Sequence, residues 1–181
     1  MTGVQTCALP ILATMEIDHY VINMKQSYRI YLDACCLNRP YDDQIQPRIA
    51  LETQAILNIL NQCELGQWKL ITSTVLETEI AQTPDLERLK NVRSILAIAK
   101  IKIASSPLLE ERSLELVQLG FSSYDAAHIA SAERSNADVF LSVDDRLIRK
   151  AQRNLEAIYV AVDNPINWLI KSTTIEDNKN D

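Results

Sequence analysis

The chain has 181 residues, of which 47% are hydrophobic and 23% are charged, and its formal net charge is -6 at pH 7. This length and composition are typical of one soluble globular domain with a core of its own. The acidic balance excludes a protein that coats nucleic acid through bulk electrostatics, because such domains are usually basic. It remains compatible with an enzyme that gathers carboxylates around a divalent cation.

Two further patterns restrict where the protein works. The sequence has no apolar run near the roughly 20 residues that a membrane-spanning helix needs, and it does not open on a basic segment followed by an apolar one, so we do not expect secretion. The cysteines, at positions 7, 35, 36 and 63, have neither CxxC spacing nor a paired histidine cluster, which disfavours zinc and disulfide frameworks. We therefore expect a cytoplasmic protein with reduced thiols.

Residues 1–11 (MTGVQTCALPI) match the translation of a common sequencing-adapter DNA. We therefore predict that residues 1–23 are an artefactual or disordered extension that takes no part in the fold. The native start is then Met24, with Met15 or a lost upstream start as the alternatives.

The first predicted elements are a strand, a helix and a second strand. Residues 28–33 (YRIYLD) form a short β-prone run that ends in a carboxylate, and a loop containing Pro40 follows it. Apolar residues at helical spacing predict a helix over residues 47–63, which Gly66 ends. Residues 69–73 (KLITS) are read as the second strand.

The middle of the chain is mostly helical. A short helix over residues 74–81 is followed by longer helical patterns over residues 86–100 and 107–119. Residues 101–103 (IKI) are read as a small strand between those two helices. A further helix opens at Ser122 and runs to residue 134, since Ser and Asp residues suit its first turn.

The last predicted elements repeat the alternation of strand and helix. We expect strands over residues 138–142 (DVFLS) and 158–162 (IYVAV), a helix over residues 144–153, and a short closing helix after Pro165. Residues 172–181 are polar and are expected to be a frayed tail. Strands that alternate with helices throughout predict an α/β fold, a three-layer sandwich around a mostly parallel sheet.

Acidic residues follow the predicted strands. In a parallel sheet the ligand crevice lies beyond the carboxyl ends of the strands. Asp33 ends the first strand, Glu79 lies in the helix after the second, Asp125 opens a later helix, and Asp144 follows the strand that contains FLS. The topology therefore predicts that four acids from distant parts of the sequence converge at one edge of the sheet.

A divalent cation is the simplest physical reason to gather these carboxylates. Unpaired, the acids repel one another, which raises their pKa values and lowers stability. Hard oxygen ligands suit Mg²⁺ or Mn²⁺. Such a site is suited to phosphodiester hydrolysis, because the metal polarises a phosphoryl oxygen and activates water, so that no protein nucleophile is needed. This agrees with the absence of a G-x-S-x-G motif from the sequence.

At this point the sequence resembles a known family. YLDACCLNRPYDD, ITSTVLETEI, YDAAHIASAE and FLSVDDRLIRKA, followed by VDNPINWL, resemble the successive motifs of PIN-domain proteins, particularly the VapC-type toxin ribonucleases of prokaryotic toxin–antitoxin pairs. The resemblance runs in order from about residue 28 to residue 170. It implies a flavodoxin-like PIN domain over residues 24–171, Mg²⁺- or Mn²⁺-dependent endoribonuclease activity on RNA, a cognate antitoxin partner and a homodimer.

The resemblance also implies roles for individual residues. Asp33 matches the first metal-binding aspartate of the family, Glu79 its glutamate, Asp125 the third acid and Asp144 the fourth. Ser142 stands where the family often has a Thr or Ser that supports the site by hydrogen bonding. The sequence departs from the family after the first aspartate, where Ala34 and Cys35 stand instead of a Thr or Ser and a small polar residue. We therefore expect a supporting hydrogen bond to be missing there.

Two of the acids have a neighbour that competes for the same role. Glu77 lies two residues from Glu79, so the two cannot share one helix face, and we prefer Glu79. Asp145 directly follows Asp144 and is read as a helix cap, so we prefer Asp144.

Other polar side chains near the predicted crevice have two interpretations each. His128 lies three residues after Asp125, and we prefer packing with a hydrogen bond over a metal-ligand role for it. Cys35 and Cys36 are read as small buried residues. Basic residues that could line the mouth of the crevice and hold RNA phosphates include Arg39, Arg146, Arg149 and Lys150, although the last three are equally well read as a solvated helix face.

Three functions remain on this basis. The first is an endoribonuclease toxin whose cleavage leaves a 5′-phosphate and a 3′-hydroxyl. The second is a catalytically weak PIN-like binding or regulatory module. The third, a metal-dependent phosphatase, is disfavoured because it would usually need a second aspartate closely following the first, and Cys35 stands two positions after Asp33.

Overall fold

A computed structural model describes residues 27–177 of the chain, so the predicted extension at residues 1–23 lies outside the described residues. Its centre is one five-stranded sheet with the order β3-β2-β1-β4-β5, and every neighbouring pair of strands is parallel. The strands are β1 (Arg29–Leu32), β2 (Lys69–Ser73), β3 (Ile101–Ile103), β4 (Val139–Leu141) and β5 (Ala161–Asp163).

The central strands are buried on both faces. Ile30, Tyr31 and Leu32 of β1 are fully buried, and β1 pairs with Leu70 of β2 on one side and with Phe140 of β4 on the other. Near-continuous apolar runs are typical of strands in a parallel sheet that helices cover on both faces. The strands could therefore be predicted from the apolar composition of short runs, and not from an alternation of apolar and polar residues.

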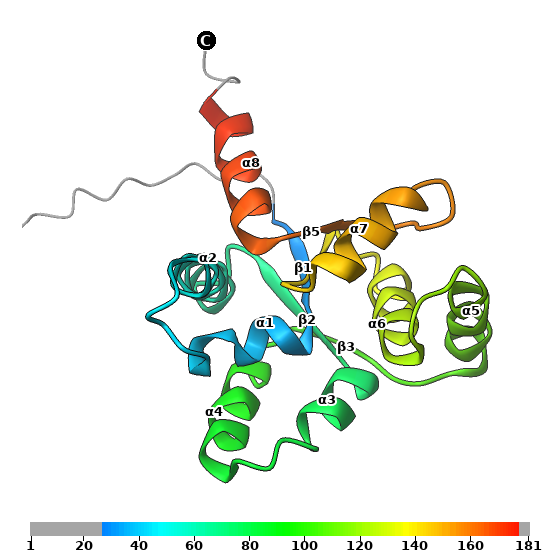
Figure 1. The fold of residues 1–181 in the computed structure, drawn as a ribbon, viewed down its shortest axis with the longest axis horizontal. Helices are drawn as coiled ribbons and strands as arrows, with labels where there is room; N and C mark the ends of the chain where they lie inside the picture. Colours follow the sequence, from blue (N-terminus) through cyan, green and yellow to red (C-terminus); the bar gives the residue numbers. More distant parts are fainter. Residues whose placement is uncertain (1–26, 178–181) are drawn as a thin grey trace, which may run out of the picture.

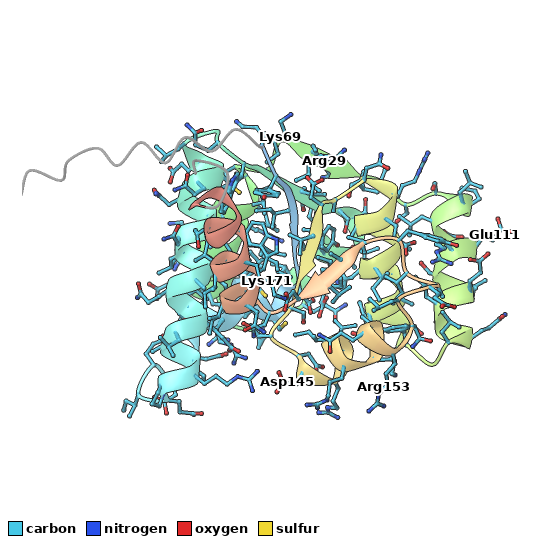
Figure 2. The ribbon with its side chains drawn as sticks, turned by 90° about the horizontal axis from the view of Figure 1, so that it is seen from above. Arg29, Lys69, Glu111, Asp145, Arg153 and Lys171 are labelled. Atoms are coloured by element: carbon cyan, nitrogen blue, oxygen red, sulfur yellow. The ribbon has the colours of Figure 1, made fainter. Side chains whose placement is uncertain are left out.

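Helices cover both faces of the sheet, which confirms the predicted α/β three-layer fold. Figure 2 shows α2 with α8 on one side of the strands and α6 with α5 on the other, and Figure 1 shows the same separation. The helices, with the 3-10 turn η1, are α1 (Ala34–Asn38), η1 (Arg39–Tyr41), α2 (Pro47–Glu64), α3 (Thr74–Ile80), α4 (Leu86–Leu96), α5 (Pro107–Gln118), α6 (Ser123–Arg134), α7 (Asp145–Arg153) and α8 (Pro165–Asp177).

Several elements differ from the sequence expectation, among them α4, which ends at Leu96 rather than at residue 100. Where a loop with Pro40 was predicted, the chain forms α1 and then η1, because α1 buries Cys36 and Leu37 beneath it. The last strand begins at Ala161 rather than at residue 158, since the Tyr159 amide donates to Glu133 Oε1 instead of pairing with β4. Helix α8 continues to Asp177, past residue 171.

The order of the strands places a ligand-binding position at one edge of the sheet. The chain runs outward from β1 to β2 and β3, and then returns to lay β4 on the opposite side of β1. Ligands of open α/β sheets bind beyond the carboxyl ends of the strands where the order reverses in this way. Asp33 directly follows β1 and Ser142 directly follows β4, so both stand at this position.

None of the described helices is both long enough and apolar enough to cross a membrane.

Candidate metal centre

Three side chains meet at the edge of the sheet where the strand order reverses. Asp33 follows β1, Glu79 comes from α3 and His128 from α6, and one ligand atom of each lies within 4.8 Å of the others. Asp33 and His128 are buried, while the Glu79 side chain is 35% exposed. Two carboxylates and an imidazole are a donor set that can hold a divalent cation.

Asp33 is held in place by its backbone and by two hydrogen bonds to one of its oxygens. Its amide continues the sheet by donating to the Leu141 carbonyl at 2.9 Å. The Ser142 hydroxyl donates to Asp33 Oδ2 at 2.6 Å, and the Cys35 thiol donates to the same oxygen at 3.1 Å. Burial raises the pKa of Asp33, while His128 and these two hydrogen bonds act in the opposite direction.

Cys35 corrects two expectations drawn from the sequence. The predicted loss of a supporting hydrogen bond after Asp33 was wrong, because the thiol itself supplies one. The interpretation of Cys35 as a small buried residue was also wrong, because it is only half-buried, whereas Cys36 is fully buried and donates to the Leu141 carbonyl. A thiol was an unexpected partner because it is only a weak hydrogen-bond donor.

The two glutamates of α3 separate clearly. Glu79 Oε2 lies 2.6 Å from His128 Nε2, within the three-residue cluster. Glu77 instead forms an ion pair with Lys102 of β3, with 2.7 Å between Nζ and Oε2. Residues two apart on a helix point in different directions, and the structure places Glu79, the preferred candidate, at the edge where Asp33 lies.

His128 is buried beside the cluster and has a partner for each ring nitrogen. Nδ1 lies 2.8 Å from the Tyr31 hydroxyl, and Nε2 faces Glu79. The burial and the hydrogen bonds expected of His128 are present, and its imidazole also stands among the atoms that could surround a cation. The sequence signal was its position three residues after Asp125 on one helix.

Asp125 and Asp144 lie at the same edge of the sheet but outside the cluster of three. Asp125 is half-buried in the first turn of α6, and its amide donates to the Ser122 hydroxyl. Asp144 is exposed and caps α7, where Oδ1 accepts from the Arg146 amide at 2.7 Å. Its own amide donates to Ser142 Oγ at 3.1 Å, so this hydroxyl joins Asp144 to Asp33.

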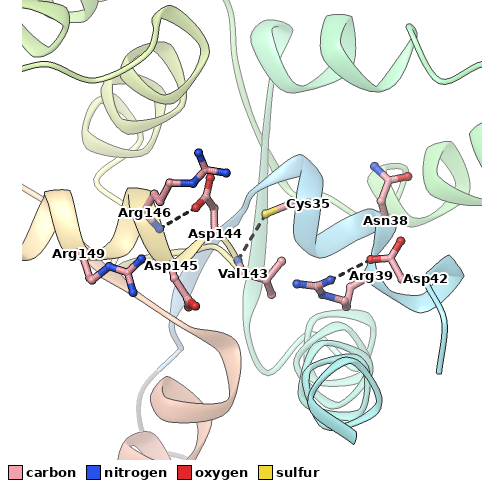
Figure 3. A pocket seen from close by; sticks show the side chains of 9 residues that line it. All are labelled: Cys35, Asn38, Arg39, Asp42, Val143, Asp144, Asp145, Arg146 and Arg149. Carbon is pink, nitrogen blue, oxygen red and sulfur yellow. Dashed lines mark hydrogen bonds and ion pairs between the residues drawn. The ribbon is translucent and has the colours of Figure 1, made fainter. Parts of the chain in front are cut away.

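A pocket of about 580 Å³ opens beside Cys35 and Asp144 (Figure 3). The start of α7 forms one of its walls, and the residues from Cys35 to Asp42 form the other. Three arginines line it, namely Arg39, Arg146 and Arg149. The pocket therefore places cationic side chains next to the predicted fourth acid, as a site for a phosphodiester chain requires.

The arginines of the pocket differ in how they are paired. Arg39 is only 17% exposed and forms ion pairs with Glu52 at 2.9 Å and Asp42 at 3.0 Å. Arg146 and Arg149 are exposed, and neither forms an ion pair with a side chain of residues 27–173. Their guanidinium groups are therefore better placed than that of Arg39 to bind an anion from solution.

Glu52 was not predicted from the sequence. It lies on α2 and is fully buried. Its carboxylate forms ion pairs with Arg39 and Arg48, each at 2.9 Å, and accepts a hydrogen bond from the side-chain amide of Asn164 at 2.9 Å. Arg48 also forms a bidentate pair with Asp145, at 2.6 and 2.7 Å. The interpretation of Asp145 as a helix cap was wrong, because Asp144 caps α7 and Asp145 is its first residue. The only local sequence signal for this buried acid was Arg48, which stands four residues before Glu52 on the same helix.

The electrostatics of the cluster leave room for a cation. Asp33 and Glu79 are neighbours, yet no Lys or Arg pairs with either one in the described part of the chain. The charge of Glu79 adds to the rise in the pKa of Asp33 that burial causes. The two carboxylates and their unmatched charge therefore fit a divalent metal ion that prefers oxygen ligands, such as Mg²⁺ or Mn²⁺.

The sequence was also compared with known proteins. No curated protein matches it. Among solved structures, the crystal structure of PAE2754 from Pyrobaculum aerophilum has a TM-score of 0.48 and 16% sequence identity, with 82% of this chain and 99% of that chain covered. The PIN domain family matches residues 30–153, a span that extends from β1 to the end of α7 and is well over half of the chain. This chain therefore belongs to the PIN-domain family, whose members are generally nucleases.

Proposed function

We propose that this protein is a metal-dependent endoribonuclease, the toxin of a toxin–antitoxin pair. One observation carries the proposal: the carboxylates of Asp33 and Glu79 meet at the edge of the sheet with no Lys or Arg to neutralise them among the described residues. Membership of a family of nucleases supplies the class of reaction.

The four predicted acids would have two different roles at the metal. Asp33 and Glu79 are its direct ligands in this proposal, and Asp125 and Asp144 complete the acidic edge and order water around it. When bound, Mg²⁺ or Mn²⁺ polarises the phosphoryl group and makes a water molecule a stronger nucleophile. The supporting Ser142 hydroxyl and the Cys35 thiol both engage Asp33 Oδ2, which leaves Oδ1 without a hydrogen bond in this part of the chain.

The arginines of the pocket would hold the RNA. Arg146 and Arg149 can each bind a phosphate of the strand, since their side chains are exposed and have no acid partner within the described residues. Arg39 lies in the same pocket but is tied to Glu52 and Asp42, so its contribution is to orient the strand with its remaining donors. Phosphate contacts of this kind position a nucleic acid without reading its sequence.

The test of activity uses the purified chain with structured and unstructured RNA, in Mg²⁺ or Mn²⁺. We expect internal cleavage that leaves a 5′-phosphate and a 3′-hydroxyl, that EDTA stops and that added metal restores. Asp33→Asn should lower kcat/KM on the order of 10³-fold, about 4 kcal/mol of barrier. Cleavage that survives EDTA, or that Asp33→Asn leaves unchanged, would rule the proposal out.

A matched control separates the metal centre from its surroundings. Glu77→Gln removes the neighbouring acid of α3, which pairs with Lys102, and should leave cleavage within about twofold of the wild type because surface ion pairs contribute little. Glu79→Gln, two residues away on the same helix, should lower cleavage nearly as far as Asp33→Asn does.

The toxin role is tested separately from the chemistry. We propose that the protein acts in the cytoplasm as a homodimer and that a cognate antitoxin suppresses it. Expression of the wild-type chain alone should arrest growth, and Asp33→Asn should not. A co-purified antitoxin should suppress cleavage of RNA. Cleavage in vitro without any growth arrest would support the ribonuclease activity and contradict the toxin role.

The competing function is a PIN-like binding or regulatory module without turnover. Its main support in the sequence was the departure after Asp33, and the Cys35 thiol fills that role in the structure. Calorimetric titration with Mn²⁺ distinguishes the two. Absence of binding by the wild-type protein would favour the module.

A further inference from the structure

A buried line of hydrogen bonds leads from the end of β2 to the candidate metal centre. Ser73 Oγ lies 2.7 Å from the Tyr31 hydroxyl, which lies 2.8 Å from His128 Nδ1. His128 Nε2 lies 2.6 Å from Glu79 Oε2. Ser73, Tyr31 and His128 are each at most 2% exposed, so water does not compete for these bonds.

The direction of these bonds follows from the hydrogens available. Ser73 Oγ already accepts from the Leu76 amide, which leaves its hydroxyl hydrogen free for Tyr31. Tyr31 can then donate to His128 Nδ1, and the imidazole carries its hydrogen on Nε2, facing Glu79. If the imidazole is charged, Nδ1–H donates to Tyr31 and Tyr31 to Ser73. In both cases Nε2–H donates to the Glu79 carboxylate.

The imidazole is itself rigidly held. Its ring packs against Tyr31 with centroids 5.8 Å apart and against Phe140 with centroids 6.4 Å apart. Glu79, by contrast, is a long side chain on the seven-residue helix α3, whose buried residues are Leu76 and Ile80. Such a side chain gives up substantial rotamer freedom when it is fixed. The bond from His128 offsets this cost and selects one position of the carboxylate.

We infer that His128, oriented by Tyr31 and Ser73, is a positioning residue that presents the second oxygen of Glu79 to the cation beside Asp33. This inference rests on the proposed metal-dependent function. Oε2 is occupied by the imidazole, so Oε1 is the oxygen left for the metal. Partners that orient a metal ligand in this way typically change metal affinity or activity by about 10–100-fold when they are removed.

The experiment compares Tyr31→Phe and His128→Gln with the wild type. Tyr31→Phe keeps the ring in the core but removes the hydroxyl that orients the imidazole, and His128→Gln keeps one donor for Glu79. Mn²⁺ affinity is measured by calorimetry, and kcat and KM for RNA are measured at several Mn²⁺ concentrations. Tyr159→Phe is the control, because it removes the hydroxyl of a tyrosine that is 75% exposed and takes no part in these hydrogen bonds. Circular dichroism and thermal unfolding check the fold of each variant.

We expect Tyr31→Phe to weaken Mn²⁺ binding by about 10-fold, and His128→Gln by up to about 100-fold, the range seen for such partners. The KM for RNA should stay unchanged, and saturating Mn²⁺ should restore most of kcat. A residue needed only for packing would not show recovery with metal. If the wild type binds Mn²⁺ and cleaves RNA while folded Tyr31→Phe and His128→Gln match it, the role of His128 is disproved and the function stands. If the wild type neither binds nor cleaves, both proposals fall.

Discussion

Two buried acids of this protein have opposite surroundings. Glu52 on α2 is fully buried, and Arg39, Arg48 and the Asn164 amide all reach its carboxylate. Asp33 after β1 is 8% exposed, and it receives a hydroxyl and a thiol but no Lys or Arg of the described chain. Each carboxylate has given up most of its hydration, which is costly unless a cation replaces it.

The difference separates a structural acid from a functional one. At Glu52 the chain supplies the cations itself, and the result is a cross-link between α2, η1 and the loop before α8. At Asp33 no Lys or Arg of the described chain neutralises the carboxylate, and a second acid, Glu79, lies beside it. The first arrangement stabilises the fold without any ligand, whereas the second would be completed by the metal ion of the proposed function.

The largest expected effect tests the structural side of the comparison. Glu52→Gln leaves two arginines beside a neutral amide, and breaking a buried ion pair in this way typically costs about 3–5 kcal/mol. The free energy of unfolding, measured by urea denaturation, should fall by that amount. A loss below about 1 kcal/mol, the value of an exposed pair, would contradict the interpretation of Glu52 as an acid that stabilises the fold.

The next effect concerns the hydroxyl that supports Asp33. Ser142→Ala removes the 2.6 Å bond to Asp33 Oδ2 and the acceptor of the Asp144 amide. We expect the Mn²⁺ dissociation constant to rise by about 10–100-fold, as for other partners of metal ligands. Calorimetry measures this, with Ser94→Ala as the control, since the Ser94 hydroxyl only donates to a carbonyl of its own helix. Equal affinity for Ser142→Ala and the wild type would contradict the assignment.

A smaller effect tests the sign of the comparison. Burial raises the pKa of Asp33 in the folded protein, so the unfolded chain releases this proton at a lower pH. Ionisation at neutral pH therefore favours unfolding. Asp33→Asn removes this charge and should raise Tm in EDTA by about 2–4 °C, the shift that ~1 kcal/mol gives in a domain of this size.

The same variant should lose the metal response. Mn²⁺ at 100 times its dissociation constant should stabilise the wild type by about 2.7 kcal/mol, and it should leave the Tm of Asp33→Asn unchanged. A variant that is less stable than the wild type in EDTA would show that Asp33, like Glu52, serves the fold.

The smallest effect is expected at the exposed ion pair between Arg48 and Asp145. Arg48 lowers the pKa of Asp145 through its hydrogen bonds and charge, so the pair stabilises the fold above the unfolded pKa of about 4 and loses this contribution as pH falls through the lowered value. Asp145→Asn should remove ~0.2–1 kcal/mol at pH 7, as is typical of exposed pairs, with less at high salt. Urea unfolding at pH 7 and pH 3 checks this, and an equal loss at both values would contradict it.

Much of the fold could be predicted because it depends on local patterns. The runs at residues 69–73 and 101–103 became β2 and β3 with the expected bounds, since short segments rich in β-branched residues are enough for strands of this sheet. The position of β5 could not be predicted, because it depends on where Tyr159 finds a partner outside the sheet, on Glu133 of α6.

The candidate site was predictable to the extent that it follows the strands. The acids after β1 and in α3 meet because parallel strands end at one edge, and Glu79 rather than Glu77 is the one that meets Asp33. The partners of these acids were less predictable. Cys35 and the pairing of Tyr31 with His128 depend on which side chains face each other across separate elements, which spacing along the chain does not specify.

The bidentate contact between Arg48 and Asp145 has a consequence for the neighbouring pocket. It joins the first turn of α2 to the first turn of α7, while Glu52 on α2 holds Arg39 on the opposite wall. Side chains of α2 therefore hold both walls of the pocket through ion pairs. These ion pairs fix the width of the pocket in the absence of a ligand. If this pocket holds RNA as proposed, widening it for a bulkier nucleic acid would mean separating Arg48 from Asp145 or Arg39 from Glu52.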